Sequence, residues 1–240
     1  MSDITEDTLL GGRVRLRQPA KGYRAAIDPV LLASAVRAPE GAHLVEMGLG
    51  VGAAALCLLS RRPDVHITGY EIDPTLAALA RENVALNGCA DRLTIIEGDV
   101  LAAEGRFAGG YANPPYHGST ETDASPIDWK AKATVADPEP WLKAAARLLA
   151  HRAPLTLIYR SDRLPDLLSA ATGRFGGLEV APIWPRLGQA AKRLLLWGAK
   201  DSRAPFILSP GLVLHSEGGA YTPEAEALLK EAAAFPGEEA

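Results

Sequence analysis

Segments with the pattern of buried strands alternate with segments of helical pattern through most of the chain. Seven short apolar segments have the strand pattern: AHLVEM, HITGYEI, LTIIEGD, FAGGYA, PLTLIYR, LEVAPIW and RLLLWGA. Helical patterns stand between several of them: VGAAALCLLSRR, PTLAALARENVALNG, PEPWLKAAARLLA and LPDLLSAA. A helix between two strands returns the chain to the end of the sheet where the first strand began, so that the two strands run parallel. This order therefore predicts an α/β fold. We expect a mostly parallel seven-stranded sheet with helices on both faces.

Shorter elements flank this alternating core. Residues 9–17 are expected to form a hairpin that turns near Gly11 and Gly12, and residues 27–36 a helix. The tail LVLHSEGGAYTPEAEALLKEAAA predicts a short strand, a turn and a helix. No segment has the composition of a linker, so we expect a single domain. Its parts are a hairpin and helix extension at 1–40, the core at 41–200, and a strand and helix extension at 201–240.

Composition argues against several classes of protein. The formal net charge of −4 disfavours a protein that coats nucleic acid, although it leaves room for a local basic patch. Cys57 and Cys89 lie in apolar segments, as buried thiols of a reducing compartment do, and no cluster has the spacing of a metal site. The segment MSDITEDTLL lacks the regions of a signal peptide, and no apolar run is long enough to span a membrane. We therefore expect a cytoplasmic protein with no membrane partner.

A glycine-rich loop, EMGLGVGAA, joins the first core strand to its helix. Glycines here allow a tight turn and a close approach of the backbone to a ligand beside a helix N-terminus. Glu71 ends the next strand, 23 positions after Gly48, near the spacing of a carboxylate that binds a ribose diol. The loop and Glu71 fit either NAD or an adenosine cofactor without phosphate.

Two further acids distinguish these cofactors. Glu46 precedes the loop, where a carboxylate would repel a pyrophosphate but suits a cationic amino acid group. Asp99 ends the third strand and can accept a hydrogen bond from an adenine amine. S-adenosylmethionine carries an ammonium, a sulfonium, a ribose diol and an adenine amine, so we predict it as the cofactor. The predicted cofactor-binding residues are Glu46, Gly48, Gly50, Gly52, Glu71, Ile72, Asp99, Val100 and Asn113.

The stretch YANPPYHG follows the fourth strand, and its two prolines stiffen a turn. With LVEMGLGVG, GYEID, EGDV and NPPY in this order, the chain resembles the class I S-adenosylmethionine-dependent methyltransferases that methylate amines. The resemblance covers most of the chain and implies a Rossmann-like fold. The stretches GYRAAIDPVLLA and LVLHSEGGAYTPEAEALL are similar to a narrower family. That family is the bacterial tRNA (adenine-N6)-methyltransferases, which modify an adenine beside the anticodon of a valine tRNA.

This resemblance assigns catalysis to Asn113, Pro114 and Tyr116. An exocyclic adenine amine is a poor nucleophile because its lone pair is delocalised into the ring. The Asn113 amide oxygen and the Pro114 carbonyl can accept both N–H groups and aim the lone pair at the sulfonium methyl. Tyr116 offers a face on which a flipped base stacks.

The resemblance implies an enzyme whose partner is a nucleic acid, with tRNA the leading substrate. The motif also fits a side-chain amide, so an N5-glutamine methyltransferase acting on release factors is the alternative. A guanine-N2 rRNA methyltransferase and a DNA adenine methyltransferase are further alternatives within the same chemistry. Glu46, Asp99 and the proline turn disfavour a NAD-dependent oxidoreductase, and the intact motif disfavours a non-catalytic scaffold. The sequence leaves open whether the protein is a monomer or a homodimer.

Several other residues are candidates for the site. By resemblance, Tyr23, Arg24 and Asp28 line the cofactor or gate the substrate, or they simply begin a surface helix. Residues 117–137 are expected to form a long polar loop, of which 118–137 is a candidate lid. Trp184 and Trp197 are expected in the core, whereas Trp129 and Trp141 fit the core or the surface. Basic residues gather in the last third of the chain, where they would bind phosphates if they lie on the rim of the site. They are Arg160, Arg163, Arg186, Lys192, Arg193, Lys200 and Arg203.

Overall fold

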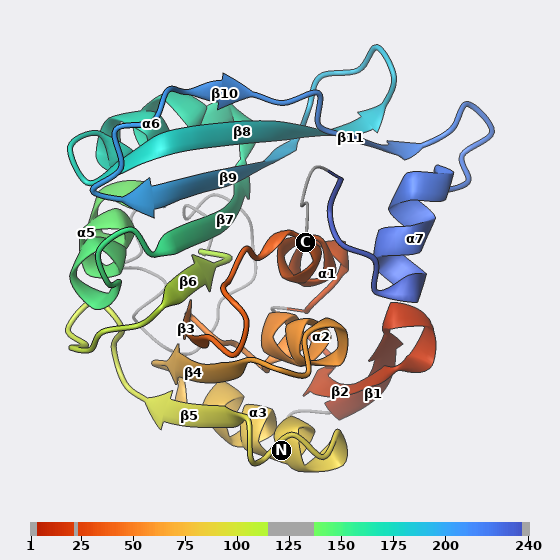
Figure 1. Cartoon of the computed structure of the whole chain (residues 1–240). Helices are drawn as coiled ribbons and strands as arrows, with labels where there is room; N and C mark the ends of the chain where they lie inside the picture. Colours follow the sequence, from red (N-terminus) through yellow and green to blue (C-terminus); the bar gives the residue numbers. More distant parts are fainter. Residues whose placement is uncertain (1–3, 22–23, 115–136, 237–240) are drawn as a thin grey trace.

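The computed structural model describes residues 4–21, 24–114 and 137–236. Within these residues a nine-stranded sheet has the order β10-β8-β9-β7-β6-β3-β4-β5, and β11 also pairs with β8 (Figure 1). Its strands are β3 (His43–Met47), β4 (His66–Glu71), β5 (Leu93–Glu97), β6 (Gly109–Ala112), β7 (Pro154–Arg160), β8 (Phe175–Arg186), β9 (Arg193–Lys200), β10 (Ile207–Leu208) and β11 (Leu212–His215). β9 pairs antiparallel with β7 and β8, and the other recorded pairs of this sheet are parallel.

All seven expected strands are present, and two short strands extend the sheet. β10 and β11 both pair along β8, the first opposite Glu179 and the second opposite Ile183 to Arg186. The tail was expected to add one strand, which is β11. β10 was missed because it has only two residues, too few for a recognisable pattern.

Helices cover both faces of the sheet (Figure 1). The main helices are α1 (Ile27–Ala35), α2 (Ala53–Arg61), α3 (Pro74–Leu86), α5 (Pro138–Leu148), α6 (Leu164–Ala171) and α7 (Pro223–Glu231), and η2 (Ser161–Arg163) is a short 3-10 turn. Leu44 packs in a cluster with α1, α2 and α3, whereas its neighbour Val45 packs in a second cluster with α5 and α6. This alternation follows from the two-residue period of a strand, and it confirms the predicted layers.

Cap residues set where several helices begin. Asp73 Oδ1 accepts a hydrogen bond of 2.8 Å from Thr75 N at the start of α3, and Pro74 occupies the first helical position. Asp137 caps α5 in the same way, and Thr222 caps α7. Such side chains satisfy N–H groups that have no partner inside the helix. The caps therefore explain why α3 and α5 begin at the residues that the sequence predicted.

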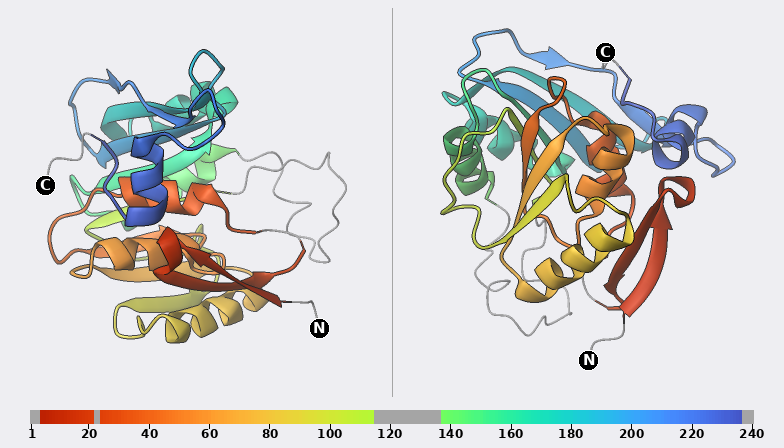
Figure 2. Two further views of the ribbon diagram at one scale, coloured as in Figure 1. Left: turned by 90° about the vertical axis from the view of Figure 1, so that its right-hand side faces the viewer. Right: turned by 60° about the horizontal axis from the view of Figure 1, so that its bottom comes forward.

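The N-terminal hairpin is longer than expected. β1 (Ile4–Leu9) pairs antiparallel with β2 (Val14–Pro19) across the turn η1 (Leu10–Gly12), whereas the sequence suggested a start near residue 9. β1 alternates exposed and half-buried residues and is largely polar, so it carries little hydrophobic signal. Figure 2 shows the hairpin beside α2 and α3, and α7 packs against α1 and the hairpin turn.

Asn83 of α3 connects the hairpin to the glycine-rich loop. The side chain is fully buried; it accepts from Arg17 N at 2.7 Å and donates to Arg17 O at 2.9 Å, as a neighbouring strand would. Its amide nitrogen also donates to Val51 O at 2.9 Å. Because a buried amide must be hydrogen-bonded, Asn83 holds the hairpin and the loop in one arrangement.

Candidate functional site

The site is expected where the order of the strands reverses. The chain runs from β3 outward through β4 and β5, then crosses to β6 and β7 on the other side of β3. In open α/β sheets, ligands bind at the carboxyl ends of the strands at such a switch point. Met47 of β3 pairs with Ala112 of β6, so Gly48 and Asn113 begin neighbouring loops at this edge. The two motifs that the sequence singled out are thereby brought together.

The glycine-rich loop adopts backbone angles that favour glycine. Gly48, Gly50 and Gly52 have φ values of +77°, +58° and +86°. Leu49 N donates to Tyr70 O at 2.8 Å, which attaches the loop to the end of β4. A left-handed backbone is strained for residues with a Cβ, so these three positions confirm the expected tight turn.

Glu71, the last residue of β4, binds the backbone of the glycine-rich loop through its carboxylate. Its Oε2 accepts from Gly50 N at 2.6 Å and its Oε1 accepts from Asp73 N at 2.8 Å. Burial raises the pKa of Glu71, and the N–H groups of Asp73 and Gly50 oppose that shift. The Gly50 N–H that a pyrophosphate would need already binds a carboxylate. The loop therefore fits a cofactor without phosphate, as S-adenosylmethionine is.

Glu46 lies at the end of β3 in an enclosed position. The side chain is 2% exposed, and its Oε2 accepts a hydrogen bond of 3.0 Å from the Tyr111 hydroxyl. The Ala55 N–H of α2 also binds this carboxyl, and burial raises the pKa of Glu46 to about 8. Its predicted contact with the ammonium of the cofactor stays a prediction. The structure adds the hydrogen-bond partner of Glu46, which the sequence did not indicate. This partner is Tyr111, which lies on β6 two residues before Asn113.

The raised pKa of Glu46 predicts a specific pH dependence of stability. The folded state binds this proton up to about pH 8, whereas the unfolded state releases it near pH 4.5. The folded state thus holds more protons between these values, and stability falls as the pH rises through that window. Glu46→Gln introduces a neutral side chain of the same size and removes this loss. We expect Glu46→Gln, compared with the parent protein, to gain up to roughly 4 kcal/mol at pH 9 and little at pH 5.

Chemical denaturation of both proteins at pH 5, 7 and 9, without cofactor, measures this difference. A constant difference across the three pH values would contradict the titration assigned to Glu46. The comparison between the two proteins is needed because other carboxyls also make the stability depend on pH. Arg62, for example, lowers the pKa of Asp64, so the stability that Asp64 contributes is lost as the pH falls.

The residues expected at the adenine end lie after β4 and β5. Ile72 is 47% exposed directly after Glu71, and Val100 is buried. Asp99 is exposed, and its Oδ1 accepts from Leu101 N at 2.8 Å, which orients the carboxyl and leaves its other oxygen to a ligand. Because β4 and β5 pair in parallel with Glu71 opposite Glu97, Asp99 and Ile72 belong to the same edge as the loop. Their contacts with the cofactor stay predictions.

The proline motif begins as β6 ends. Pro114 is buried and Asn113 is half-buried, whereas Tyr116, Trp129 and residues 118–136 of the candidate lid lie outside the described residues. β6 carries Gly109 and Gly110 where a side chain would collide with a neighbour: a Cβ would lie 2.9 Å from Leu44 and from Leu149, respectively. This close packing explains why the fourth strand has a weak hydrophobic pattern.

Trp141 is a further residue at this edge. It stands in the first turns of α5, and a Cβ on Gly48 would lie 3.0 Å from its ring. The indole ring therefore packs against the glycine-rich loop at Gly48. No pattern in the sequence signals this role, because Trp141 reaches Gly48 only through the packing of α5 on the sheet.

The candidates before the core have structural partners. Arg24 pairs with Asp7 at 2.8 Å and donates to Thr5 and to the Pro19 carbonyl, so it is bound to the hairpin. Asp28 accepts from Arg193 Nε at 2.9 Å, which joins the start of α1 to the start of β9. Tyr23 lies outside the described residues. Arg24 and Asp28 thus position the N-terminal extension, and any role toward a ligand stays a prediction.

The core predictions are confirmed at three of the four positions tested. Cys57 and Cys89 are buried thiols, and Trp197 is 3% exposed with its Nε1 donating to Ala35 O at 2.7 Å. Trp184 is only half-buried, because it lies on β8, next to the outermost strands of the sheet. Its Nε1 donates to Pro210 O at 3.2 Å. A membrane-spanning helix and a metal-binding group of three side chains are not found in the described residues.

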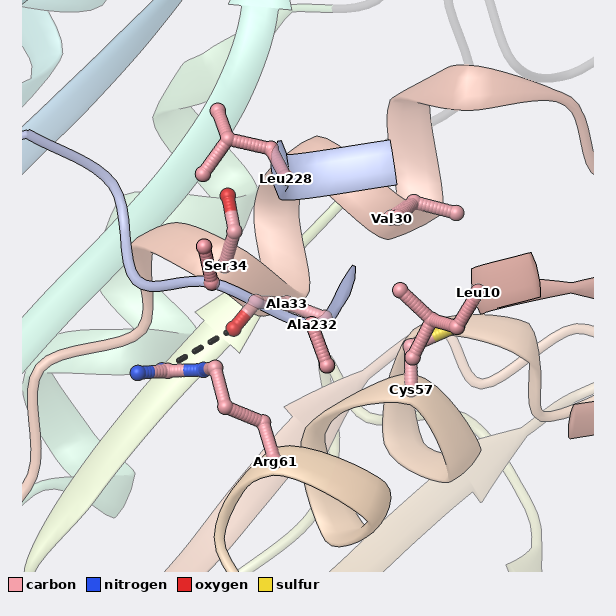
Figure 3. Close-up of a pocket in the computed structure, with 9 residues that line it drawn as sticks. Leu10, Val30, Ala33, Ser34, Cys57, Arg61, Leu228 and Ala232 are labelled. Carbon is pink, nitrogen blue, oxygen red and sulfur yellow. Dashed lines mark hydrogen bonds between the residues drawn. The ribbon is translucent and has the colours of Figure 1, made fainter. Parts of the chain in front are cut away.

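A small pocket lies away from this edge, between α1, α2, α7 and the hairpin turn. Figure 3 shows its lining, which includes Leu10, Val30, Cys57 and Leu228, with Arg61 donating to the Ala33 carbonyl at 3.1 Å. The lining is largely apolar and comes from helices that pack on one another. We interpret this pocket as a packing feature and not as the candidate site.

Known proteins resemble this chain over most of its length. A family model described as the methyltransferase small domain matches residues 26–134. The tRNA1(Val) (adenine(37)-N6)-methyltransferase of Porphyromonas gingivalis is 32% identical over 229 residues, which is 88% of this chain and 89% of that protein. The chain belongs to this methyltransferase family. The protein of the same name from Aeromonas salmonicida is 30% identical over 83% of this chain and 85% of its own.

Solved structures agree with this family. A predicted O-methyltransferase from Agrobacterium tumefaciens has a TM-score of 0.74 and 28% identity, and covers 87% of this chain and 98% of its own. TYW2 of P. horikoshii, solved with MeSAdo, has a TM-score of 0.57 at 14% identity, which shows the shared fold alone, and covers 84% of this chain and 73% of its own. The Rossmann-like class I fold is thus confirmed. The protein is an S-adenosylmethionine-dependent methyltransferase.

Proposed function

We propose that the protein transfers a methyl group from S-adenosylmethionine to the N6 amine of an adenine in tRNA, at position 37 of a valine tRNA. The observation that carries this proposal is the position of Asn113 and Pro114, which begin the loop beside Gly48 at the switch point. The names of the relatives, at about 30% identity over most of the chain, describe the same reaction.

The chemistry of an amine fits this pair of acceptors. The cofactor supplies an electrophilic methyl group on a sulfonium. The Asn113 amide oxygen and the Pro114 carbonyl are proposed to accept the two N–H groups of the target amine, which aims its lone pair at that methyl. A hydroxyl has a single hydrogen and would satisfy only one acceptor. This difference favours nitrogen over the oxygen that the name of the Agrobacterium tumefaciens protein implies.

The roles of the remaining residues follow from the same placement. Glu71 is proposed to bind the ribose diol of the cofactor and Asp99 the adenine amine, with Ile72 and Val100 against the ring. No strong base is required, because the methylated ammonium is acidic and releases its proton to water. The side chains therefore bind and orient the two reactants.

Bulk tRNA from a strain that lacks the gene tests this proposal. We expect incubation with the protein and labelled S-adenosylmethionine to produce N6-methyladenosine, measured by nucleoside mass spectrometry. A valine tRNA transcript with adenine 37 replaced by guanine is the matched control and should stay unmodified. Methylation of a release factor in place of tRNA would instead identify a glutamine methyltransferase, because a glutamine amide also presents two N–H groups.

A further inference from the structure

The basic residues of the last third of the chain lie at both ends of the strands of the sheet. The site edge is the side formed by the carboxyl ends of the parallel strands, where Asn113 lies, and the opposite edge is formed by their amino ends. Arg160 ends β7 and pairs in register with Arg193, which begins β9, so both lie at the edge that carries Asn113. Ile183 of β8 pairs with the same Arg193, and Arg186 ends β8 three residues further along. Lys192 directly precedes β9. By contrast, Lys200 is the last residue of β9 and Arg203 follows three residues later, so both lie at the opposite edge.

Ion pairs already neutralise three cations at the site edge. Arg160 pairs with Asp162 at 2.6 Å and Arg163 with Asp166 at 2.8 Å. Arg193 pairs with Asp28 at 2.9 Å. These three arginines hold the turn after β7 and the start of α1, so they add little net positive charge at this edge.

The turn between β8 and β9, residues 186–193, carries the remaining cations. Arg186 and Lys192 are exposed, and neither forms an ion pair with any residue in the described ranges. Leu187 at its tip is 87% exposed, and Gln189 N donates to Arg186 O at 3.1 Å to close the turn. The adjacent turn at 216–219 approaches Arg186, because a Cβ on Gly219 would lie 3.7 Å from its guanidinium. Glu217 of that turn is exposed, and within the described part of the chain it forms no ion pair with Arg186.

We propose that the turn at 186–193 binds the phosphate backbone of the RNA substrate through Arg186 and Lys192. This inference rests on the proposed function, because it places the RNA at the Asn113 edge. A protein with a net charge of −4 repels RNA except where cations are concentrated. β8 lies three strand spacings from β6, or roughly 14 Å, a distance that nucleotides flanking a base at Asn113 can span.

The double variant Arg186→Gln with Lys192→Gln tests the proposal. Glutamine removes the charge and keeps a polar side chain of similar length on an exposed turn. We expect the Kd for tRNA to rise about tenfold and the slope of log K against log salt to fall by roughly 1.5–2. The Kd for S-adenosylmethionine and kcat at saturating tRNA should stay unchanged. Filter binding at 50 to 200 mM salt and steady-state kinetics supply these values.

Arg152→Gln with Arg203→Gln is the matched control. Both arginines are exposed, and they lie before β7 and after β9, at the opposite edge. The control should bind tRNA as the parent does. Equal Kd and salt slope in the turn variant and the parent would overturn this inference alone, as would an equal loss in the control. If the parent itself methylated no tRNA, the proposed function would fail and the inference with it.

Discussion

Replacing Asn113 by alanine is expected to lower kcat by about a factor of 10²–10³, the effect of removing one positioned hydrogen-bonding group from a transition state. The amide oxygen is the side-chain acceptor that the motif places beside Pro114, and without it the target amine keeps one N–H unpaired. The binding of S-adenosylmethionine should weaken far less than kcat, because Asn113 is only one of the predicted cofactor-binding residues and the glycine-rich loop and Glu71 are untouched. Single-turnover methylation and titration calorimetry on the same preparation separate these two quantities.

Asn113→Asp provides the matched comparison. A carboxylate still accepts a hydrogen bond at the same position, so this variant should retain more activity than Asn113→Ala. Equal loss in both variants would instead point to a packing role for a residue that is half-buried at the end of β6. Turnover of Asn113→Ala at the parental rate would rule out the proposed role of the amide.

Glu71→Ala is expected to weaken the binding of S-adenosylmethionine about a hundredfold, as the loss of charge-assisted hydrogen bonds to a ribose diol implies. The same change leaves the N–H groups of Gly50 and Asp73 without their acceptor, so the loop loses its support. We therefore also expect a lower melting temperature without cofactor. Calorimetry with S-adenosylmethionine measures the first effect, and thermal unfolding measures the second.

Glu97→Ala is the control on the neighbouring strand. Glu97 pairs in register with Glu71 but is exposed, and its recorded partner is Arg81 at 3.5 Å. We expect nearly parental cofactor binding in this variant. If Glu71→Ala bound the cofactor as tightly as Glu97→Ala, the ribose assignment would be wrong, and a fall in melting temperature alone would leave Glu71 a purely structural role.

Much of the fold was predictable because its signals are local. α6 begins and ends as the segment LPDLLSAA predicted, and Asp73 and Gly88 bound α3 through a cap and a left-handed turn. Strand patterns predicted seven members of the sheet, and the tail pattern predicted an eighth, β11. The two-residue β10 was missed, and the polar β1 was expected to start only near residue 9, because neither has enough apolar residues to show a period.

The site was predictable in outline for a related reason. Parallel strands bring their carboxyl ends to one edge, so residues that end successive strands must meet there. This rule is enough to place Glu71, Asp99 and Asn113 together. Trp141 under Gly48 was not predictable, because it depends on how α5 packs against the sheet.

The sequence by itself determined the layers, the position of the loop and the acids at the strand ends, since hydrophobic period, glycine and caps act over a few residues. Tertiary structure alone decided that Glu46 is enclosed by Tyr111, a residue 65 positions away. It also decided that Arg186 and Lys192 share the edge of Asn113 while Arg203 lies opposite, because strand direction assigns each end to an edge. The burial of a side chain, its hydrogen-bond partners and the end of the sheet at which it lies depend on contacts between residues distant in the sequence. Such contacts exist only once the chain has folded.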